Sequence, residues 1–202
     1  MAEAGLEPDA SPGIVSRTLL RDLKKAGLRG YHHNLETAAS YFDTVCTTHA
    51  YEEDVQAVRD AIKEGLYVCS GGIFGLGEGF EHRVELALTL RDLGVPSVPV
   101  NFLTPVPGTA LEDRPVMSSG EALRTLALMR FLLPDRQVRV CGGRPSVFAK
   151  GSRSLPFKAG ITGVMTGDYL TTPGEGPRQD VDRIRRAGLT PGPHQQGEDN
   201  RG

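Results

Sequence analysis

Cys69 closes a short apolar strand and opens a glycine-rich loop, a place where a reactive thiol could meet a ligand. Four glycines follow within 71–77, and glycine lets the backbone approach a ligand closely or adopt positive φ. Ligands of parallel α/β proteins bind at the carboxyl ends of the strands. A cysteine in this place is either a thiolate ligand or a small buried hydrophobic residue. Cys46 and Cys141 are expected to be small buried hydrophobic residues.

Strand parity makes Arg139 a second candidate. In the segment 137–141, period-two alternation places Arg139 and Cys141 on one face and two valines on the other. If the valines pack beneath helices, Arg139 points to the other face of the sheet or into a barrel, where a buried guanidinium needs an anionic partner. The alternative is an exposed arginine on an edge strand.

Further polar residues fall at or near strand ends. Asn101 alternates with apolar neighbours, and it either binds a polar ligand or satisfies loop backbone. Asn34 and Glu36 follow another short strand and are either ligand contacts or loop caps. His32 and His33 are adjacent, so a regular strand would turn them to opposite faces and they could not ligate one ion together.

The composition indicates a globular protein with no nucleic-acid or membrane partner. Of the 202 residues 39% are hydrophobic, and 23 basic against 25 acidic residues give a net charge of −2. We find no basic stripe, no apolar run that could span a bilayer and no signal-peptide pattern. Three cysteines, separated by 23 and 72 residues, fit neither a disulfide framework nor a paired zinc motif. We therefore expect reduced thiols and a cytoplasmic location.

The apolar pattern predicts strands that alternate with helices. Strands are expected at 30–35, 66–69, 97–103, 138–141 and 163–165. Helices are expected at 16–26, 51–64, 80–93, 118–133 and 180–187, and a weaker helix is expected to end at residue 159. Residues 1–13 and 190–202 are expected to be disordered tails around one domain over 14–189. Five βα units at intervals of roughly 30 residues are typical of a parallel α/β fold. A closed barrel needs eight units and about 250 residues, whereas five could form a doubly wound sheet, and periodicity does not choose between them.

Several segments together resemble the biotin synthase family. They are YHHNLET at 31–37, CTTH at 46–49, VCSGGIFGLGE at 68–78, VPVNFL at 98–103, PGT at 107–109, VRVCGGR at 138–144 and YLTT at 169–172. The resemblance implies a radical-SAM enzyme on a (β/α)8 TIM barrel, of which this chain would form about five units. It implies a homodimer that inserts sulfur into dethiobiotin to give biotin. A 4Fe-4S cluster would cleave S-adenosylmethionine, and a 2Fe-2S cluster would donate the sulfur.

By position, the resemblance implies that Cys69 is a thiolate ligand and Arg139 an arginine ligand of the 2Fe-2S cluster, so both are candidate catalytic residues. The Cys-x-x-x-Cys-x-x-Cys loop that holds the family's 4Fe-4S cluster is absent from this sequence. Asp9 falls near the place of another cluster cysteine. Because no radical can be generated from S-adenosylmethionine without that three-cysteine loop, we expect this chain alone to be inactive.

The resemblance also implies contacts to the cofactor and the substrate. Asn34 and Glu36 would contact the ribose of S-adenosylmethionine, with Glu36 standing where the family often has aspartate. Ile73 would contact the adenine, and Asn101 either the ureido ring of the substrate or the cofactor. Asp54 stands where some members have an arginine that pairs with the cofactor carboxylate.

Three interpretations follow from the sequence. The first is a biotin synthase homologue represented by its C-terminal portion, either a truncated frame or a fragment completed by an N-terminal half. The two unpaired edge strands of its sheet could form hydrogen bonds with strands of another chain. The second is a non-catalytic binding or assembly module, or a gene remnant. The third is another radical-SAM enzyme on the same scaffold.

Overall fold

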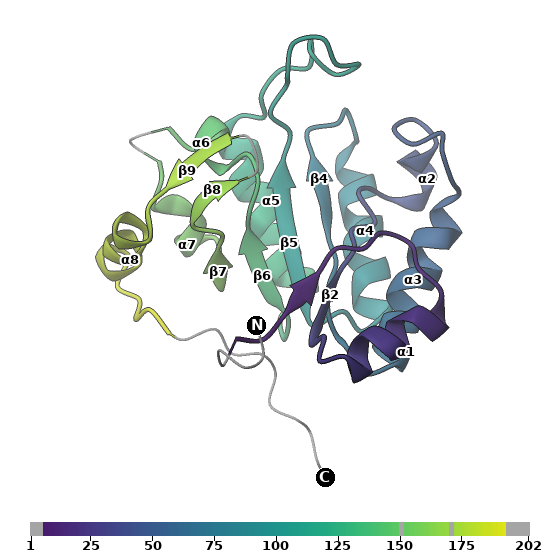
Figure 1. The fold of residues 1–202 in the computed structure, drawn as a ribbon. Coiled ribbons are helices and arrows are strands. Elements are labelled where there is room, and N and C mark those ends of the chain that lie inside the picture. The colour runs from purple at the N-terminus through teal and green to yellow at the C-terminus, as the bar shows by residue number, and fades with distance from the viewer. Residues whose placement is uncertain (1–5, 150–151, 170–171, 193–202) are drawn as a thin grey trace.

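The computed structural model describes residues 6–149, 152–169 and 172–192. Figure 1 shows strands at the centre of the molecule with helices beside and behind them. The elements, in chain order, are β1 (Asp9–Ala10), α1 (Arg17–Lys25), β2 (Gly30–His32), α2 (Ala39–Phe42), α3 (Tyr51–Lys63), β3 (Tyr67–Cys69), β4 (Gly72–Phe74), α4 (Phe80–Asp92), β5 (Ser97–Phe102), α5 (Ser119–Leu132), β6 (Gln137–Val140), α6 (Arg144–Val147), α7 (Leu155–Lys158), β7 (Gly163–Val164), β8 (Gly167–Tyr169), β9 (Thr172–Glu175) and α8 (Pro177–Arg186).

Within the described residues, parallel strands form a sheet in the order β1-β2-β3-β5-β6-β7, and β4 also pairs with β5. Parallel neighbours need a crossover connection, which here contains α1, α3, α4, α5 or the short pair α6 and α7. β8 and β9 form a separate antiparallel pair. The predicted α/β class is confirmed, and the arrangement is that of a partial (β/α)8 barrel.

The five predicted strands correspond to β2, β3, β5, β6 and β7, whereas β1 and β4 were not expected from the sequence. Asp9–Ala10 form β1 and pair with 30–31 of β2, so the expectation of a disordered 1–13 segment is wrong at these two residues. Two residues carry no periodicity, and only pairing with β2 makes them a strand. The described part of the chain ends at residue 192, and residues 170–171 of the YLTT motif also lie outside it.

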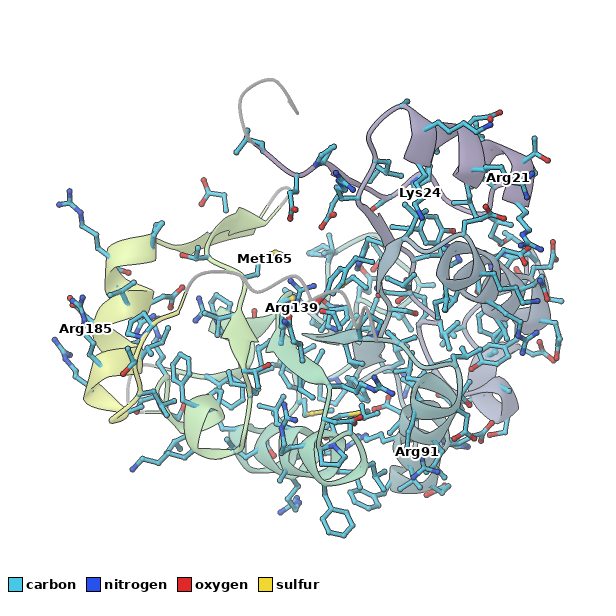
Figure 2. All side chains as sticks on the ribbon, turned by 90° about the horizontal axis from the view of Figure 1, so that it is seen from below. Arg21, Lys24, Arg91, Arg139, Met165 and Arg185 are labelled. Atoms are coloured by element: carbon cyan, nitrogen blue, oxygen red, sulfur yellow. The ribbon has the colours of Figure 1, made fainter. Side chains whose placement is uncertain are left out.

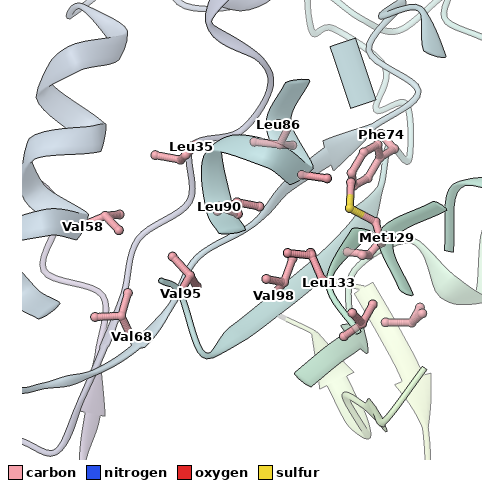
Figure 3. Packing of buried hydrophobic residues seen from close by; sticks show 14 of the residues in the cluster. Leu35, Val58, Val68, Phe74, Leu86, Leu90, Val95, Val98, Met129 and Leu133 are labelled. Atoms are coloured by element: carbon pink, nitrogen blue, oxygen red, sulfur yellow. The ribbon is translucent and has the colours of Figure 1, made fainter. Parts of the chain in front are cut away.

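The two faces of the sheet differ in chemistry. Val68, Val98, Val100, Val138 and Val140 are at most 1% exposed and point towards the helices. Figure 3 shows Val68 and Val98 in one cluster with side chains from α3, α4 and α5. Parity places polar side chains of the same strands on the other face, away from this core. The apolar cluster therefore fixes which residues face the interior of the partial barrel.

The C-terminal helix α8 is joined to α6 by a buried ion pair. Arg144, the first residue of α6, donates to both carboxylate oxygens of Asp180 at 2.7 and 2.8 Å. Both side chains are at least 94% buried, and paired guanidinium and carboxylate groups tolerate such burial. None of the helices in the described ranges is long and apolar enough to cross a membrane.

Gly71 offers a test of this packing. A Cβ atom there would lie 2.0 Å from the backbone oxygen of Pro99 in β5, so Gly71→Ala must push the short link between β3 and β4 away from β5. We expect the free energy of unfolding to fall by about 1–3 kcal/mol in urea denaturation. Gly120→Ala is the control, because it lies in α5 with nothing within 4 Å of its added Cβ. It should be neutral or stabilising by up to about 1 kcal/mol. Equal stability of the two variants would contradict the packing described.

Candidate functional site

Cys69 and Arg139 meet on the polar face of the sheet. Arg139 Nη2 donates a hydrogen bond to Cys69 Sγ at 2.8 Å, across 70 positions of sequence. β6 lies between β5 and β7, so the alternative of an edge-strand arginine is wrong. Gly163 pairs in register with Arg139, and a Cβ there would lie only 3.1 Å from the arginine Cγ. Figure 2 shows Arg139 in the middle of the molecule, whereas the other labelled arginines project from its periphery.

The electrostatics of this contact favour a paired but buried thiol. Burial raises the pKa of the Cys69 thiol, and the guanidinium of Arg139 offsets only part of that shift. Burial also acts to lower the pKa of Arg139, but the neighbouring Cys69 and Cys141 thiolates raise it overall. Burial raises the pKa of Cys141 to about 11. Both thiols are therefore protonated at neutral pH unless a metal ion displaces the proton.

Asn34 and Glu36 lie just beyond the carboxyl end of β2. Asn34 Oδ1 accepts a hydrogen bond from the Gly71 amide at 3.2 Å, and the Glu36 carbonyl accepts one from Ile73 at 2.8 Å. Glu36 has a φ of 62°, which is uncommon for a residue with a side chain. Its buried Oε2 has no hydrogen-bond partner among the described residues. Strain and an unpaired acceptor at one residue are typical of a binding site.

Burial also changes the acidity of Glu36. It raises the pKa of this carboxyl to about 7, with a smaller contribution from the Asp54 charge, while a hydrogen bond from Asn34 acts in the opposite direction. The carboxyl group is therefore about half protonated near neutral pH. It can serve as an acceptor, or, when protonated, as a donor to a polar ligand.

Ile73 and Asn101 are register partners in β4 and β5. Asn101 is 8% exposed; its Nδ2 donates to the Gly72 carbonyl at 3.2 Å and its Oδ1 accepts from the Gly142 amide at 2.9 Å. Of the two alternatives for Asn101, the structure contains the contact with loop backbone. This amide joins two glycine loops at the same end of the sheet, beside Ile73.

The two adjacent histidines make different contacts. His32 pairs in register with Cys69, and burial lowers its pKa. His33 Nε2 lies 2.7 Å from Asp54 Oδ1, in the first turn of α3. Asp54 stood out in the sequence only as a possible cofactor contact. Its actual partners were missed because no periodicity joins the end of a strand to the start of the next helix.

A buried ion pair behind the glycine loop was also missed. Glu78 accepts hydrogen bonds from the amides of Gly75 and Gly77 at 3.0 and 3.1 Å, and from Arg83 Nε at 2.8 Å. Arg83 also donates to Glu121 of α5 at 2.7 Å. This network holds the loop after β4 against α4 and α5. The signal in the sequence was a glutamate at the end of a glycine loop.

The fold and the site define a class, a parallel α/β partial barrel with polar groups at the carboxyl ends of its strands. Methylornithine synthase has the same fold, with a TM-score of 0.75 at 19% identity over 94% of this chain and 60% of that one. The FeFe-hydrogenase maturase from Carboxydothermus hydrogenoformans also has this fold, with a TM-score of 0.71 at 17% identity over 90% of this chain and 46% of the maturase. The model of the Biotin and Thiamin Synthesis associated domain matches residues 99–190.

Sequence comparison then gives a more particular similarity: most of this chain is similar in sequence to biotin synthases. It is 50% identical over 188 residues to the biotin synthase of Geotalea uraniireducens, covering 93% of this chain and 57% of the relative. It is 56% identical over 180 residues to that of Desulforudis audaxviator, covering 89% and 55%. The chain therefore spans little more than half the length of these relatives, consistent with their C-terminal portion.

The residues present fit part of the metal chemistry that similarity to biotin synthases implies. Cys69 and Arg139 lie in contact, so a sulfur atom and a guanidinium group stand side by side. No three His, Cys, Asp or Glu side chains in the described ranges are grouped to hold a metal ion. A cluster held by three closely spaced cysteines does not fit these 202 residues, whose three cysteines lie 23 and 72 positions apart.

Arg139→Met tests the electrostatic part of the Cys69 contact. Loss of the guanidinium removes the stabilisation of the thiolate, so we expect the pKa of Cys69 to rise further. The midpoint of iodoacetamide reaction at Cys69 against pH, followed by peptide mass spectrometry, measures it. Arg91→Met is the control, because Arg91 is paired with Asp92 on the surface. An unchanged midpoint in Arg139→Met would contradict the contact.

Glu36→Gln tests the buried carboxyl. The pKa of Glu36 is raised from 4.5 to about 7 in the folded chain, so the folded state binds the proton more tightly. The wild type should then lose stability as the pH rises from 4.5 to about 7, by at most about 1.4 kcal/mol per pH unit. Glu36→Gln should flatten that slope in urea denaturation, whereas Glu52→Gln, an exposed control, should keep it. A slope unchanged by Glu36→Gln would show that this carboxyl is not the cause.

Proposed function

We propose that this chain is part of a biotin synthase-type radical-SAM sulfurtransferase that converts dethiobiotin to biotin. About 90% of the chain aligns with biotin synthases at 50% and 56% identity, and this similarity supports the proposed function. The observation that carries it is the contact of Cys69 and Arg139 at 2.8 Å on the polar face of the sheet. A thiol and a guanidinium held together inside a partial barrel are an unusual pair, and we propose that they stand at the positions of two ligands of the sulfur-donating cluster.

In this proposal Cys69 and Arg139 would ligate the 2Fe-2S cluster. When bound, that cluster supplies the sulfur atom. The chain's own contribution is to bring a buried thiol and a partly buried guanidinium together. The Arg139 charge favours the thiolate that a metal ligand must be, against the burial that disfavours it. The stem of Arg139, lying over Gly163, keeps the guanidinium in place.

Asn34, Glu36 and Ile73 would contact S-adenosylmethionine. The unpaired Oε2 of Glu36 is suited to accept a hydrogen bond from a ribose hydroxyl, and an occupied site would remove the cost of its burial. Ile73, half-buried next to this group, offers apolar surface to the adenine. Asn101 would contact the substrate or the cofactor with hydrogen-bonding capacity that its two backbone contacts leave over.

The 4Fe-4S cluster that cleaves S-adenosylmethionine would be held by residues other than these. We propose that the 202-residue chain alone yields no 5′-deoxyadenosine, and that it acts with a complementing N-terminal half or within a homodimer. We further propose a cytoplasmic location. Asp54, at a position where some members have arginine, leaves the carboxylate of the cofactor to other partners.

A chimera tests the proposed function. The front half of the Desulforudis audaxviator relative, fused to this chain, should let a biotin auxotroph grow on dethiobiotin, whereas the chain alone should not. Cys69→Ala in the chimera should abolish growth because one ligand is lost, and Cys46→Ala should retain it.

The companion measurement is 5′-deoxyadenosine after anaerobic reconstitution with iron and sulfide. A chimera that forms 5′-deoxyadenosine but no biotin would indicate another radical-SAM reaction. Product above background from the chain alone would contradict the assignment of the 4Fe-4S cluster to residues outside it.

A further inference from the structure

The loop between α2 and α3 gathers a thiol, an imidazole and a carboxylate. His49 Nδ1 lies 3.5 Å from Cys46 Sγ, and His49 Nε2 lies 3.0 Å from Asp54 Oδ2. The cluster is separate from the Cys69 and Arg139 contact and lies at the side of the molecule that carries α2 and α3 in Figure 1. A nucleophile, a base within reach of it and a third group that orients the base are the components of an activated nucleophile.

The carboxylate is held firmly in this array. Asp54 is 3% exposed and lies in the first turn of α3, where helix geometry favours a negative charge. His33 contacts its Oδ1 at 2.7 Å while His49 contacts its Oδ2, so both oxygens are engaged. The His49 ring also packs edge-on against Phe42, with 5.6 Å between ring centroids. These contacts leave the imidazole little freedom to rotate.

The orientation of His49 determines what its second nitrogen can do. A hydrogen on Nε2 donates to the carboxylate of Asp54, so the neutral ring carries its lone pair on Nδ1. That nitrogen faces Cys46 Sγ at 3.5 Å and Thr48 Oγ1 at 3.0 Å. The thiol of Cys46 can therefore donate its proton to Nδ1. Cys46 itself is partly exposed, so a small reactant can reach the sulfur.

We infer that Cys46, His49 and Asp54 form a thiol-activating site that carries out thiol–disulfide exchange with small disulfides. His49 takes the proton from Cys46, and the thiolate attacks one sulfur of the disulfide. A bond forms between the two sulfurs as the original disulfide bond breaks. The leaving thiolate keeps the electron pair and receives the proton from His49. One thiol and one disulfide give one mixed disulfide and one free thiol, so no other oxidant is needed.

The charges around the site support this order of ionisation. Hydrogen bonds from Thr48, and more weakly the His49 imidazole, lower the pKa of Cys46. A hydrogen bond to Asp54 and the nearby charges of Asp54 and Glu53 raise the pKa of His49, so its imidazolium persists to higher pH. His33, which directly follows β2, faces the same carboxylate. By contrast, burial raises the pKa of Cys69 and Cys141.

The site is joined to the strand end that carries the candidate cofactor contacts. Asp54 is shared between His49 and His33, and His33 directly precedes Asn34. A group attached to Cys46 Sγ must displace Thr48 or His49 from the sulfur. Cys46 is therefore three hydrogen-bond contacts away from His33, the residue that follows β2, although the exchange does not depend on the proposed sulfur insertion.

The experiment compares the three thiols of the folded chain. The chain, freed of reductant under nitrogen, is mixed with the neutral probe 2-hydroxyethyl disulfide from about pH 5 to about pH 9, and mixed disulfide at each cysteine is quantified by peptide mass spectrometry. Cys46 is expected to react roughly tenfold faster than Cys69 or Cys141 near neutral pH. In urea-unfolded chain the three rates should converge.

Variants separate activation from mere access. His49→Gln and Asp54→Asn should slow Cys46 roughly three- to tenfold near pH 7 and move the midpoint of its pH–rate curve upwards. Glu52→Gln, which removes an exposed carboxylate from the same helix turn, should change neither. Circular dichroism checks the fold, and the wild-type comparison stands if a variant fails to fold. Cys46 reacting no faster than Cys141, or an Asp54→Asn midpoint equal to that of the wild type, would overturn the proposal.

Discussion

The hydrogen bond between Arg139 and Cys69 depends on one constraint, the two-residue period of a parallel sheet. Valines at alternate positions of β3, β5 and β6 need cover from helices, so the residues between them must face the other way. Because neighbouring strands are in register, a thiol at the end of β3 and a guanidinium in β6 come together across β5. The helical core therefore sets the position of a polar pair that it does not touch.

The loops at the carboxyl ends of the strands complete the site through backbone contacts. The side chain of Asn34 accepts a hydrogen bond from the Gly71 amide, and the side chain of Asn101 forms hydrogen bonds with the backbone of Gly72 and Gly142. The backbone bridge between Glu36 and Gly72 of β4 holds Glu36 in its unusual conformation. These amides position the loops, and the carboxylate of Glu36 is left with an unpaired oxygen. The same region combines close glycine packing with an unsatisfied acceptor, as expected where a ligand replaces missing contacts.

Much of this arrangement could be predicted from the sequence because its signals were periodic. The alternation of polar and apolar residues over 137–141 predicted the face of the sheet on which Arg139 lies. The apolar patterns of the helices and strands predicted the α/β class. β1 and β4 could not be predicted, since segments of two or three residues have no period and become strands only by pairing. The partners of Asp54 were equally inaccessible, because they depend on where α3 lies against β2. The resemblance to biotin synthase supplied roles for Cys69 and Asn34 that spacing alone left open.

The most direct test of the account is a double-mutant cycle on Cys69 and Arg139 in the apo chain. The free energies of unfolding of Cys69→Ala, Arg139→Met and the double variant are measured in urea at pH 7. A buried contact between them predicts a coupling energy of about 1–2 kcal/mol. Effects that add to within about 0.5 kcal/mol would contradict it, because side chains that do not meet show no such coupling.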